Sequence, residues 1–253
     1  MRFKTYDEAI DWLFTQIPAF HRIGAGAYKP GLERTLRLAG MFGNPHLGIK
    51  AVHIAGTNGK GSVASLLASV AQASRLRTGL FTSPHLVDFR ERIRINGEMI
   101  SQCEVLDFLE RFAQLNESEQ IEPSFFELTT IMALDHFRRH NVDFAVIETG
   151  LGGRLDSTNI ITPLLSVVTN ISLDHTSLLG NTREAIAGEK AGIIKPGVAA
   201  VIGENDPEIA DVFASVAARC GSRLTDASAT CEIESWREEG ECNIYETRSH
   251  GIL

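Results

Sequence analysis

The sequence predicts an α/β fold in which a mostly parallel β-sheet carries helices on both faces. Short runs that are apolar throughout alternate with longer segments of helical periodicity, and strands without a polar face are typical of a parallel sheet covered on both sides. One such run, Ala51–Ala55, breaks into a glycine-rich turn and continues into an alanine-rich helix from Ser62 to Ala73. This order of strand, turn and helix is the building unit of such a sheet.

The composition is that of an ordinary globular chain, with 253 residues, 43% of them hydrophobic and 22% charged. A chain of this size buries roughly three quarters of its unfolded surface, which allows one large domain or two small ones. The net charge of −8 argues against a general surface for nucleic acid or anionic membranes, so a phosphate site must be a local positive feature. The opening residues lack the pattern of a signal peptide, and no apolar run is long enough for a bilayer.

The cysteines show neither a CxxC pair nor the spacing of a metal site. We therefore expect reduced thiols in a cytoplasmic protein. The four are Cys103, Cys220, Cys231 and Cys242.

Two helices are expected before the first strand. Apolar residues recur at helical spacing from Tyr6 to Ile17, and a second helix is expected over Gly31–Phe42. Between them, Pro18–Pro30 is punctuated by glycines and prolines and is expected to form a loop.

The first strand leads into a motif that predicts a phosphate-binding loop, as in phosphate-loop NTPases. Glycines between Gly56 and Gly61 allow backbone N–H groups to converge on an anion, and the following helix adds its positive N-terminal end. Lys60 would reach the β- and γ-phosphates, and the Ser62 hydroxyl would face Mg²⁺. The usual signature places the hydroxyl directly after the lysine, whereas Gly61 intervenes here.

The next segments mix a strand, a hairpin and two capped helices. Arg77–Thr82 is expected to be a short strand, and the alternation over Arg90–Ile95 before Asn96-Gly97 predicts a hairpin outside the parallel sheet. Ser101 and Ser124 each precede a glutamate by three residues, which is the spacing of a capping box and marks a helix start.

The alternation of strands and helices continues to about residue 225. Beyond it the pattern weakens, and Glu232–Tyr245 is compatible with a polar hairpin. We expect the fold core to span about 31–225 within one domain of 1–253, with 226–253 as an appended segment. The remaining predicted elements are strands at Val142–Glu148, Leu164–Thr169 and Gly197–Ile202, and helices at Thr182–Ala191 and Pro207–Cys220.

Polar residues at the strand ends are candidate ligands, because ligands of open α/β sheets gather where strands end. Glu148 ends an apolar strand, and a triphosphate site needs a carboxylate oxygen for Mg²⁺. Asp174 and His175 follow the next strand; oxygen preference favours Asp174, but the residues alone leave the pair undecided. Lys190 would ordinarily be a solvated lysine near a helix C-terminus.

Several motifs in order resemble the folylpolyglutamate synthase and dihydrofolate synthase branch of the Mur ligases. The likeness runs from about Gly31 to Lys195, and the Lys-Gly-Ser order of the phosphate loop is the form this family uses. The motifs are Gly31 to Arg34, Gly56 to Ser62, Ser83 to Leu86, Glu91 to Arg94, Glu148 with Gly150 to Asp156, Leu173 to Thr176, and Glu189 to Ile193.

The resemblance implies an ATP-dependent acid–amine ligase. In such an enzyme ATP phosphorylates the carboxylate of dihydropteroate or of a folate, and the α-amino group of L-glutamate then displaces phosphate. The triphosphate would be held by Thr57, Asn58, Gly59, Lys60, Gly61 and Ser62.

The same resemblance assigns roles to residues that periodicity leaves unexplained. Ser83, Glu148 and His175 match metal positions, which favours His175 over Asp174, and Lys190 matches a lysine carried as a carbamate that helps hold a second Mg²⁺. We group Lys60, Lys190 and His175 as catalytic candidates. Two stretches match contacts to the pterin substrate, although core packing is expected for at least one phenylalanine among them: Ser124, Phe125 and Phe126, and Leu155, Asp156 and Ser157.

Members of the family continue into a C-terminal domain that helps place glutamate, and this chain does not contain it. We therefore expect a monomeric nucleotide-binding part that takes ATP, Mg²⁺, the folate or dihydropteroate and L-glutamate as ligands. It should show little ligase turnover by itself. Two other function classes stay open: another phosphate-loop enzyme, such as a small-molecule kinase or a GTPase, and a catalytically silent nucleotide-binding module.

Overall fold

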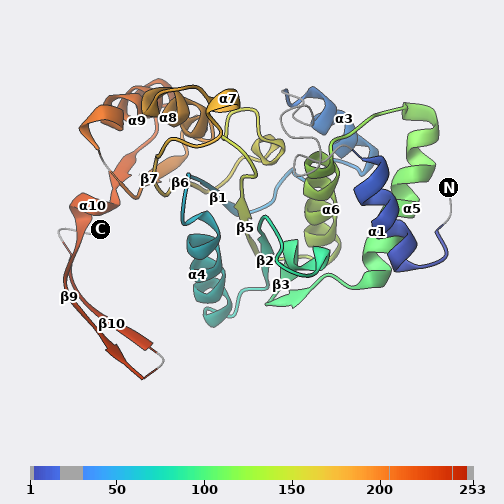
Figure 1. Cartoon of the computed structure of the whole chain (residues 1–253), viewed down its shortest axis with the longest axis horizontal. Coiled ribbons are helices and arrows are strands. Elements are labelled where there is room, and N and C mark those ends of the chain that lie inside the picture. Colours follow the sequence, from blue (N-terminus) through green and yellow to red (C-terminus); the bar gives the residue numbers. More distant parts are fainter. Residues whose placement is uncertain (1–2, 18–30, 205, 241, 250–253) are drawn as a thin grey trace.

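The computed structural model describes residues 3–17, 31–204, 206–240 and 242–249 (Figure 1). Its centre is a sheet of eight strands in the order β4-β3-β2-β5-β1-β6-β7-β8. The predicted loop Pro18–Pro30 lies outside the described residues. The strands are β1 (Ala51–Ala55), β2 (Thr78–Phe81), β3 (Ile93–Ile95), β4 (Glu98–Met99), β5 (Phe144–Glu148), β6 (Leu165–Val168), β7 (Ala199–Ile202) and β8 (Leu224–Asp226).

The helices cover both faces of this sheet, as the apolar strands predicted. In Figure 1, α4 lies on one face and α6 on the other, while α8 and α9 pack together beside β7. The α-helices are α1 (Tyr6–Gln16), α3 (Glu33–Met41), α4 (Lys60–Ala73), α5 (Gln102–Glu119), α6 (Phe125–Arg139), α7 (Thr176–Leu179), α8 (Arg183–Ala191), α9 (Pro207–Cys220) and α10 (Ala227–Thr230). Within the described residues, 3₁₀ turns lie at Phe89–Arg92 and Ser157–Ile160.

Most expected elements are present, with boundaries that differ by one or two residues. The α4 helix begins at Lys60 rather than Ser62, because Gly59 takes a left-handed conformation (φ 80°) and serves as its N-cap. Both predicted capping boxes form, at Ser101 and at Ser124. The short elements α7 and β8 have too few residues to show periodicity and were not predicted.

The predicted hairpin forms, but its expected place outside the sheet is wrong. Asn96 and Gly97 both have positive φ, the conformation of a tight two-residue hairpin turn. The strand β3 then pairs antiparallel with β2, with Gly79 opposite Ile95 and Phe81 opposite Ile93. The hairpin therefore extends the parallel sheet at one edge, because the unpaired side of β2 offers its backbone groups.

The strand order creates a crevice beside β1. This strand is buried along its whole length and lies between β5 and β6, parallel to both. The chain passes from β1 to strands on one side and later returns to β6 on the other side. Loops after such a strand diverge, so ligands are expected at the carboxyl ends of β1, β5 and β6.

Three apolar clusters hold the helices on the sheet. The largest joins α1, α3, α5 and α6 to one face, and Ala9 and Leu13 of α1 are fully buried within it. A second cluster lies under α4, and a third lies between α8, α9 and β7. The N-terminal helix thus belongs to the same core as the segments after residue 31.

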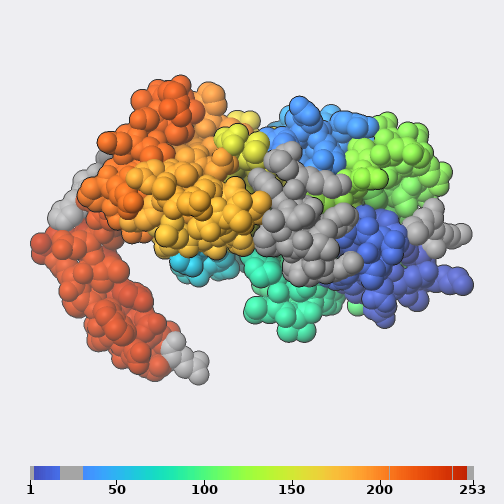
Figure 2. Space-filling view, turned by 45° about the horizontal axis from the view of Figure 1, so that its top comes forward, coloured from blue at the N-terminus to red at the C-terminus, as the bar shows by residue number. Residues whose placement is uncertain are grey.

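The polar hairpin expected near the C-terminus is also present. The strands β9 (Cys231–Glu239) and β10 (Cys242–Ser249) pair antiparallel and extend from the body of the molecule (Figures 1 and 2). Their side chains are almost all exposed, including Trp236 and Tyr245, which lie opposite each other. No helix among the described residues has the length and apolarity needed to cross a membrane.

Candidate active site

The phosphate loop follows β1 at the carboxyl edge of the sheet. Gly56 has φ 149° and lies so close to the β6 loop that an added Cβ would be 1.9 Å from Thr169 Oγ1. Gly59 caps α4 without a side-chain hydrogen bond to the helix. The first-turn N–H groups of α4 are therefore free of a side-chain cap, and such a helix start binds anions.

The loop after β6 fixes the shape of the phosphate loop. Asn170 accepts both the Thr57 N–H at its backbone oxygen and the Asn58 N–H at Oδ1, each at 2.9 Å. The Thr57 hydroxyl accepts the Ser172 N–H at 3.0 Å and donates to the Ser172 carbonyl at 3.2 Å. Thr57 and Asn58, two of the predicted nucleotide-binding residues, are thus held by hydrogen bonds to the segment that follows β6.

Two lysines from distant segments converge on a single carbonyl oxygen. Lys60 Nζ donates to the Gly56 oxygen at 3.0 Å and to the Thr57 oxygen at 3.1 Å. Lys190 Nζ, on α8, donates to the same Gly56 oxygen at 2.8 Å. Lys190 is buried rather than solvated, and this burial, with the nearby Lys60 charge, lowers its pKa to about 8.

Glu148 is the acidic group of this site. It is the last residue of β5, is only 3% exposed, and accepts the Ser83 N–H at Oε2 over 3.1 Å. Burial raises its pKa to about 7, although the Ser83 hydrogen bond and the Lys60 charge oppose the shift. A Cβ added to Gly61 would lie 3.6 Å from Glu148 Oε2, so the carboxylate faces the start of α4.

The loop carrying Asp174 and His175 lies at the same edge. His175 takes a left-handed conformation and is the N-cap residue of α7, and its Nε2 is 3.7 Å from Asp174 Oδ2. The Asp174 charge acts on Lys190, where it opposes part of the lowering of the lysine pKa. Both members of the pair therefore belong to the site region, and their geometry does not choose one over the other as a ligand.

Asp156, predicted as a substrate contact, lies in the glycine-rich loop that follows β5. It is buried, and its Oδ2 accepts the N–H groups of Gly150 and Leu151 at 2.9 and 2.8 Å. Its Oδ1 accepts the Thr158 N–H and hydroxyl. Both oxygens are thus engaged within the loop, so the carboxylate shapes the glycine-rich turn after β5. Leu155 is half-buried and Ser157 is buried beside it.

The two phenylalanines at the start of α6 differ in environment. Phe125 is a core residue that stacks on Phe14 with ring centroids 5.3 Å apart, which is the packing role expected for at least one of the pair. Phe126 is half-buried and its ring lies against Gly150, where an added Cβ would come within 2.5 Å. Ser124 caps the helix by accepting the Glu127 N–H.

Two residues of the site region were missed in the sequence. Arg92 is 6% exposed, donates from Nε to His85 Nδ1 at 2.7 Å, and its charge acts on Glu148. Burial lowers the pKa of Arg92 to about 10. Asn170 lies two residues after the end of β6 and holds the phosphate loop, so the rule that ligand sites form just beyond strand ends could have found it.

Comparison with known proteins agrees with the fold and the site motifs. The Mur ligase middle domain matches residues 54–250. Dihydrofolate synthase/folylpolyglutamate synthase of Bacillus subtilis is 41% identical over 236 residues, which cover 91% of this chain and 53% of that protein. The chain spans about half the length of the curated relatives it matches.

Solved structures show the same likeness. An FPGS complex with AMPPCP and folate superposes with a TM-score of 0.89 at 36% identity, covering 97% of this chain and 59% of that one. Escherichia coli FolC in complex with DHPP and ADP gives 0.79 at 31% identity, covering 96% and 55%. The chain belongs to the Mur ligase family, in its folylpolyglutamate and dihydrofolate synthase branch.

Proposed function

We propose that this chain is the nucleotide-binding part of an ATP-dependent ligase that joins L-glutamate to dihydropteroate or a folate through an acyl phosphate. The observation that carries the proposal is the meeting of Lys60, Glu148 and Lys190 at the phosphate loop. The relatives' complexes with AMPPCP, ADP, folate and DHPP support the nucleotide and the substrate class.

The chain's own groups fit the first half of this reaction. The N–H groups at the start of α4 and the Lys60 ammonium would hold the triphosphate and neutralise charge on the γ-phosphoryl group. The substrate carboxylate attacks the γ-phosphorus, so that ADP leaves and a carboxyl–phosphate bond forms. The N–H groups and the Lys60 ammonium would act by positioning the phosphates and by stabilising charge rather than by covalent chemistry.

The second half is an attack by the glutamate amine on the activated carbonyl carbon. The amine loses a proton, phosphate leaves with the bonding electrons, and an amide remains. A free carboxylate is a poor acyl donor, which explains why ATP is consumed. We infer that Phe126, beside the Gly150 turn, lies closer to the pterin than Phe125, because Phe125 is enclosed in the core.

Magnesium fits the donors present at this edge. Glu148 supplies a carboxylate oxygen next to the start of α4, and Ser62 is exposed in the first turn of that helix. Hard oxygen donors together with phosphate oxygens are what Mg²⁺ binds. When bound, the ion would neutralise charge on the phosphates; Ser83 and His175 are the further ligands proposed.

Lys190 is proposed to carry a carbamate. The reaction adds carbon dioxide to the neutral amine, with loss of one proton, and turns a cation into an anion that helps hold a second Mg²⁺. A pKa near 8 leaves a substantial fraction of the amine neutral at pH 7.5. Carbon-13 bicarbonate should give a carbamate resonance that disappears in Lys190→Arg and persists in Lys195→Arg, a control at a half-buried lysine. A resonance unchanged in Lys190→Arg would contradict the assignment.

The ligase proposal is tested by trapping the intermediate. With protein in excess over ATP and dihydropteroate, hydroxylamine should capture an acyl phosphate as a hydroxamate, even when complete turnover is slow. A stable phosphoester would indicate a kinase, and failure to bind a non-hydrolysable ATP analogue would indicate a silent module; either result would overturn the proposal. A chain extended by the family's C-terminal domain should add glutamate far faster. We further propose that the protein is cytoplasmic and monomeric.

A further inference from the structure

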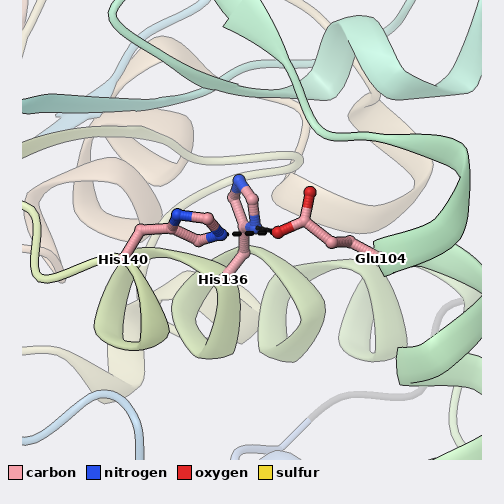
Figure 3. Close-up of side chains that lie close together, drawn as sticks. All are labelled: Glu104, His136 and His140. Atoms are coloured by element: carbon pink, nitrogen blue, oxygen red, sulfur yellow. Dashed lines mark hydrogen bonds and ion pairs between the residues drawn. The ribbon is translucent and has the colours of Figure 1, made fainter.

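A second polar cluster lies at the opposite edge of the sheet. It joins Glu104 in the first turn of α5 to His136 and His140 at the end of α6, and Figure 3 shows the three side chains pointing toward one another. His140 Nε2 is 2.5 Å from Glu104 Oε1, and His136 Nδ1 is 3.4 Å from the same oxygen. All three ligand atoms lie within 4.8 Å of one another.

The helix cap orients the Glu104 carboxylate. Its Oε2 accepts the Ser101 N–H at 3.2 Å and the Ser101 hydroxyl at 2.6 Å, which closes the capping box. The other oxygen, Oε1, is thereby aimed at the two imidazoles. A carboxylate fixed by outer hydrogen bonds is the arrangement that orients a metal ligand.

The two histidines share one face of α6 because they are four residues apart. Two histidines at this spacing on a helix, with an acid from elsewhere, form a common set of three protein ligands for zinc. His136 is buried, and burial lowers its pKa to about 4, which leaves a neutral ring. The C-terminal end of α6 also favours a cation through the helix dipole.

The separations suit a small tetrahedral ion. With metal–ligand bonds of about 2.0–2.1 Å, two ligand atoms of a tetrahedral site lie about 3.3 Å apart. The 3.4 Å between His136 Nδ1 and Glu104 Oε1 already matches this separation. His140 would have to open from its 2.5 Å hydrogen bond by less than about 1 Å, and its partial exposure permits this.

A pocket of about 660 Å³ lies beside the cluster and could admit a fourth ligand. Its lining includes Arg77, Asn96, Glu98 and Asp143 together with the three candidate ligands. Arg77 and Asp143 precede β2 and β5, whereas Ser83 follows β2 and Glu148 is the last residue of β5. A strand of five residues spans about 16 Å, so the pocket is well separated from the phosphate loop.

We propose that Glu104, His136 and His140 form a binding site for a divalent transition metal, best suited to Zn²⁺, with a fourth position open to this pocket. Two nitrogens and one carboxylate oxygen are a donor set of intermediate softness, which suits Zn²⁺ better than Mg²⁺ or Ca²⁺. The site would link the start of α5 to the end of α6 across the edge of the sheet.

Two neighbouring cations oppose the metal, because the Arg139 charge acts on His136 and Arg77 contacts His140. Arg77 Nη2 lies 3.3 Å from His140 Nδ1, where the guanidinium can only donate. A ring that accepts at Nδ1 keeps its proton on Nε2, which faces Glu104. Metal binding through Nε2 therefore requires the exposed Arg77 side chain to move away.

The test uses Zn²⁺ and Co²⁺ as probes on the chelator-stripped chain. Titration against a chromophoric chelator should show one Zn²⁺ equivalent, and Co²⁺ should give the intense visible absorption of a four-coordinate ion. His140→Gln and Glu104→Gln should each weaken Zn²⁺ binding at least tenfold, since loss of even an outer-shell partner costs about that much. Glutamine at position 104 can still close the capping box, which preserves the helix start.

Two variants serve as controls. Cys103→Ser removes the exposed thiol next to Glu104, and Glu148→Gln alters the acidic group at the phosphate edge; both should keep the Zn²⁺ equivalent. Equal Zn²⁺ affinity in wild type and His140→Gln, or loss of the equivalent in Cys103→Ser or Glu148→Gln, would overturn the proposal. Circular dichroism checks folding, and His140→Gln decides the question if Glu104→Gln misfolds, because His140 is partly exposed.

Discussion

The two ends of the parallel strands carry polar clusters that are held in contrasting ways. At the carboxyl edge, charged side chains bind backbone groups: Lys60 and Lys190 share the Gly56 carbonyl, and Glu148 accepts the Ser83 N–H. At the amino edge, Glu104 and His140 bind each other. A site built on backbone needs glycines and fixed loops, whereas a site built from side chains needs only two helices in the right register.

The contrast predicts which changes at one edge leave the other intact. The carboxyl edge holds a buried carboxylate and a buried lysine, whose desolvation costs stability. The amino edge is partly exposed, and its carboxylate contacts the imidazole side chains directly. Substitutions at the phosphate loop should therefore change stability or ligand affinity more than substitutions around α5 and α6 do.

The largest effect should come from Glu148→Gln. In the metal-free protein, burial raises the carboxyl pKa from its ordinary value of 4.5 to about 7, so between these pH values the folded state holds a proton that the unfolded state has lost. The contribution of this protonation to the free energy of unfolding is therefore fully present below about pH 4.5. It is lost as pH rises through 7, which lowers the free energy of unfolding by up to about 3 kcal/mol. The stability of Glu148→Gln should not fall with pH in this way, so the variant should be more stable than wild type at pH 8.

Denaturant unfolding at pH 5 and pH 8, with a chelator present, measures this difference. Glu184→Gln, an exposed first-turn residue of α8, should leave the wild-type pH dependence unchanged. A wild-type protein whose stability relative to Glu148→Gln does not change over this range would show that the carboxylate is solvated, and the contrast between the edges would be lost.

Lys60→Ala should come next in size. Removing the ammonium deletes a charge-assisted contact to phosphate, for which we expect about 100-fold weaker binding of a non-hydrolysable ATP analogue, or about 2.7 kcal/mol. Isothermal titration gives the value. Lys50→Ala, at an exposed position before β1, is the matched control. An analogue bound equally by Lys60→Ala would remove this lysine from the nucleotide site.

Gly153→Ala should destabilise the protein by about 2 kcal/mol, in the range of overpacking. An added Cβ would lie 2.8 Å from the carbonyl oxygens of Glu189 and Lys190, so the loop after β5 and the end of α8 would have to separate. Gly188→Ala, in the same helix with nothing within 4 Å of its added Cβ, should instead stabilise by up to about 1 kcal/mol. Thermal unfolding compares them; equal effects would mean that the contact is not tight.

The smallest effect should be seen at the amino edge with Arg77→Gln. Removing the guanidinium near His140 should tighten Zn²⁺ binding about fivefold, because a surface charge interaction of this kind is worth about 1 kcal/mol. Arg37→Gln removes an equal charge elsewhere and should change little. Weaker Zn²⁺ binding in Arg77→Gln would show that the arginine supports the cluster instead of competing with a metal.

The same contrast explains how far the sequence could predict the molecule. Glycines of the phosphate loop and apolar strands are local signals, so β1, α4 and the parallel sheet were predictable from Ala51 to Ala73. The burial of Lys190 was not, because it depends on α8 packing against a loop from the other half of the chain. Periodicity alone would have left it in solvent.

Some roles depended on tertiary packing that no local pattern records. The Asp156 carboxylate folds back on the Gly150 turn, and the hairpin at Asn96 joined the sheet edge because β2 had a free side. Glu104 was predicted to close the capping box with Ser101, and the structure confirms this. Its second oxygen, however, faces two histidines that lie more than thirty residues away in the sequence. Contacts of this kind can be recognised only once the packing of the helices in three dimensions is known.

The most direct test of the central claim measures how Mg²⁺ affects binding of a non-hydrolysable ATP analogue. If the triphosphate and its cation lie between the phosphate loop and Glu148, Mg²⁺ should tighten binding in wild type and in Glu104→Gln but not in Glu148→Gln. Mg²⁺ tightening that persists undiminished in Glu148→Gln would place the cation elsewhere and contradict the account.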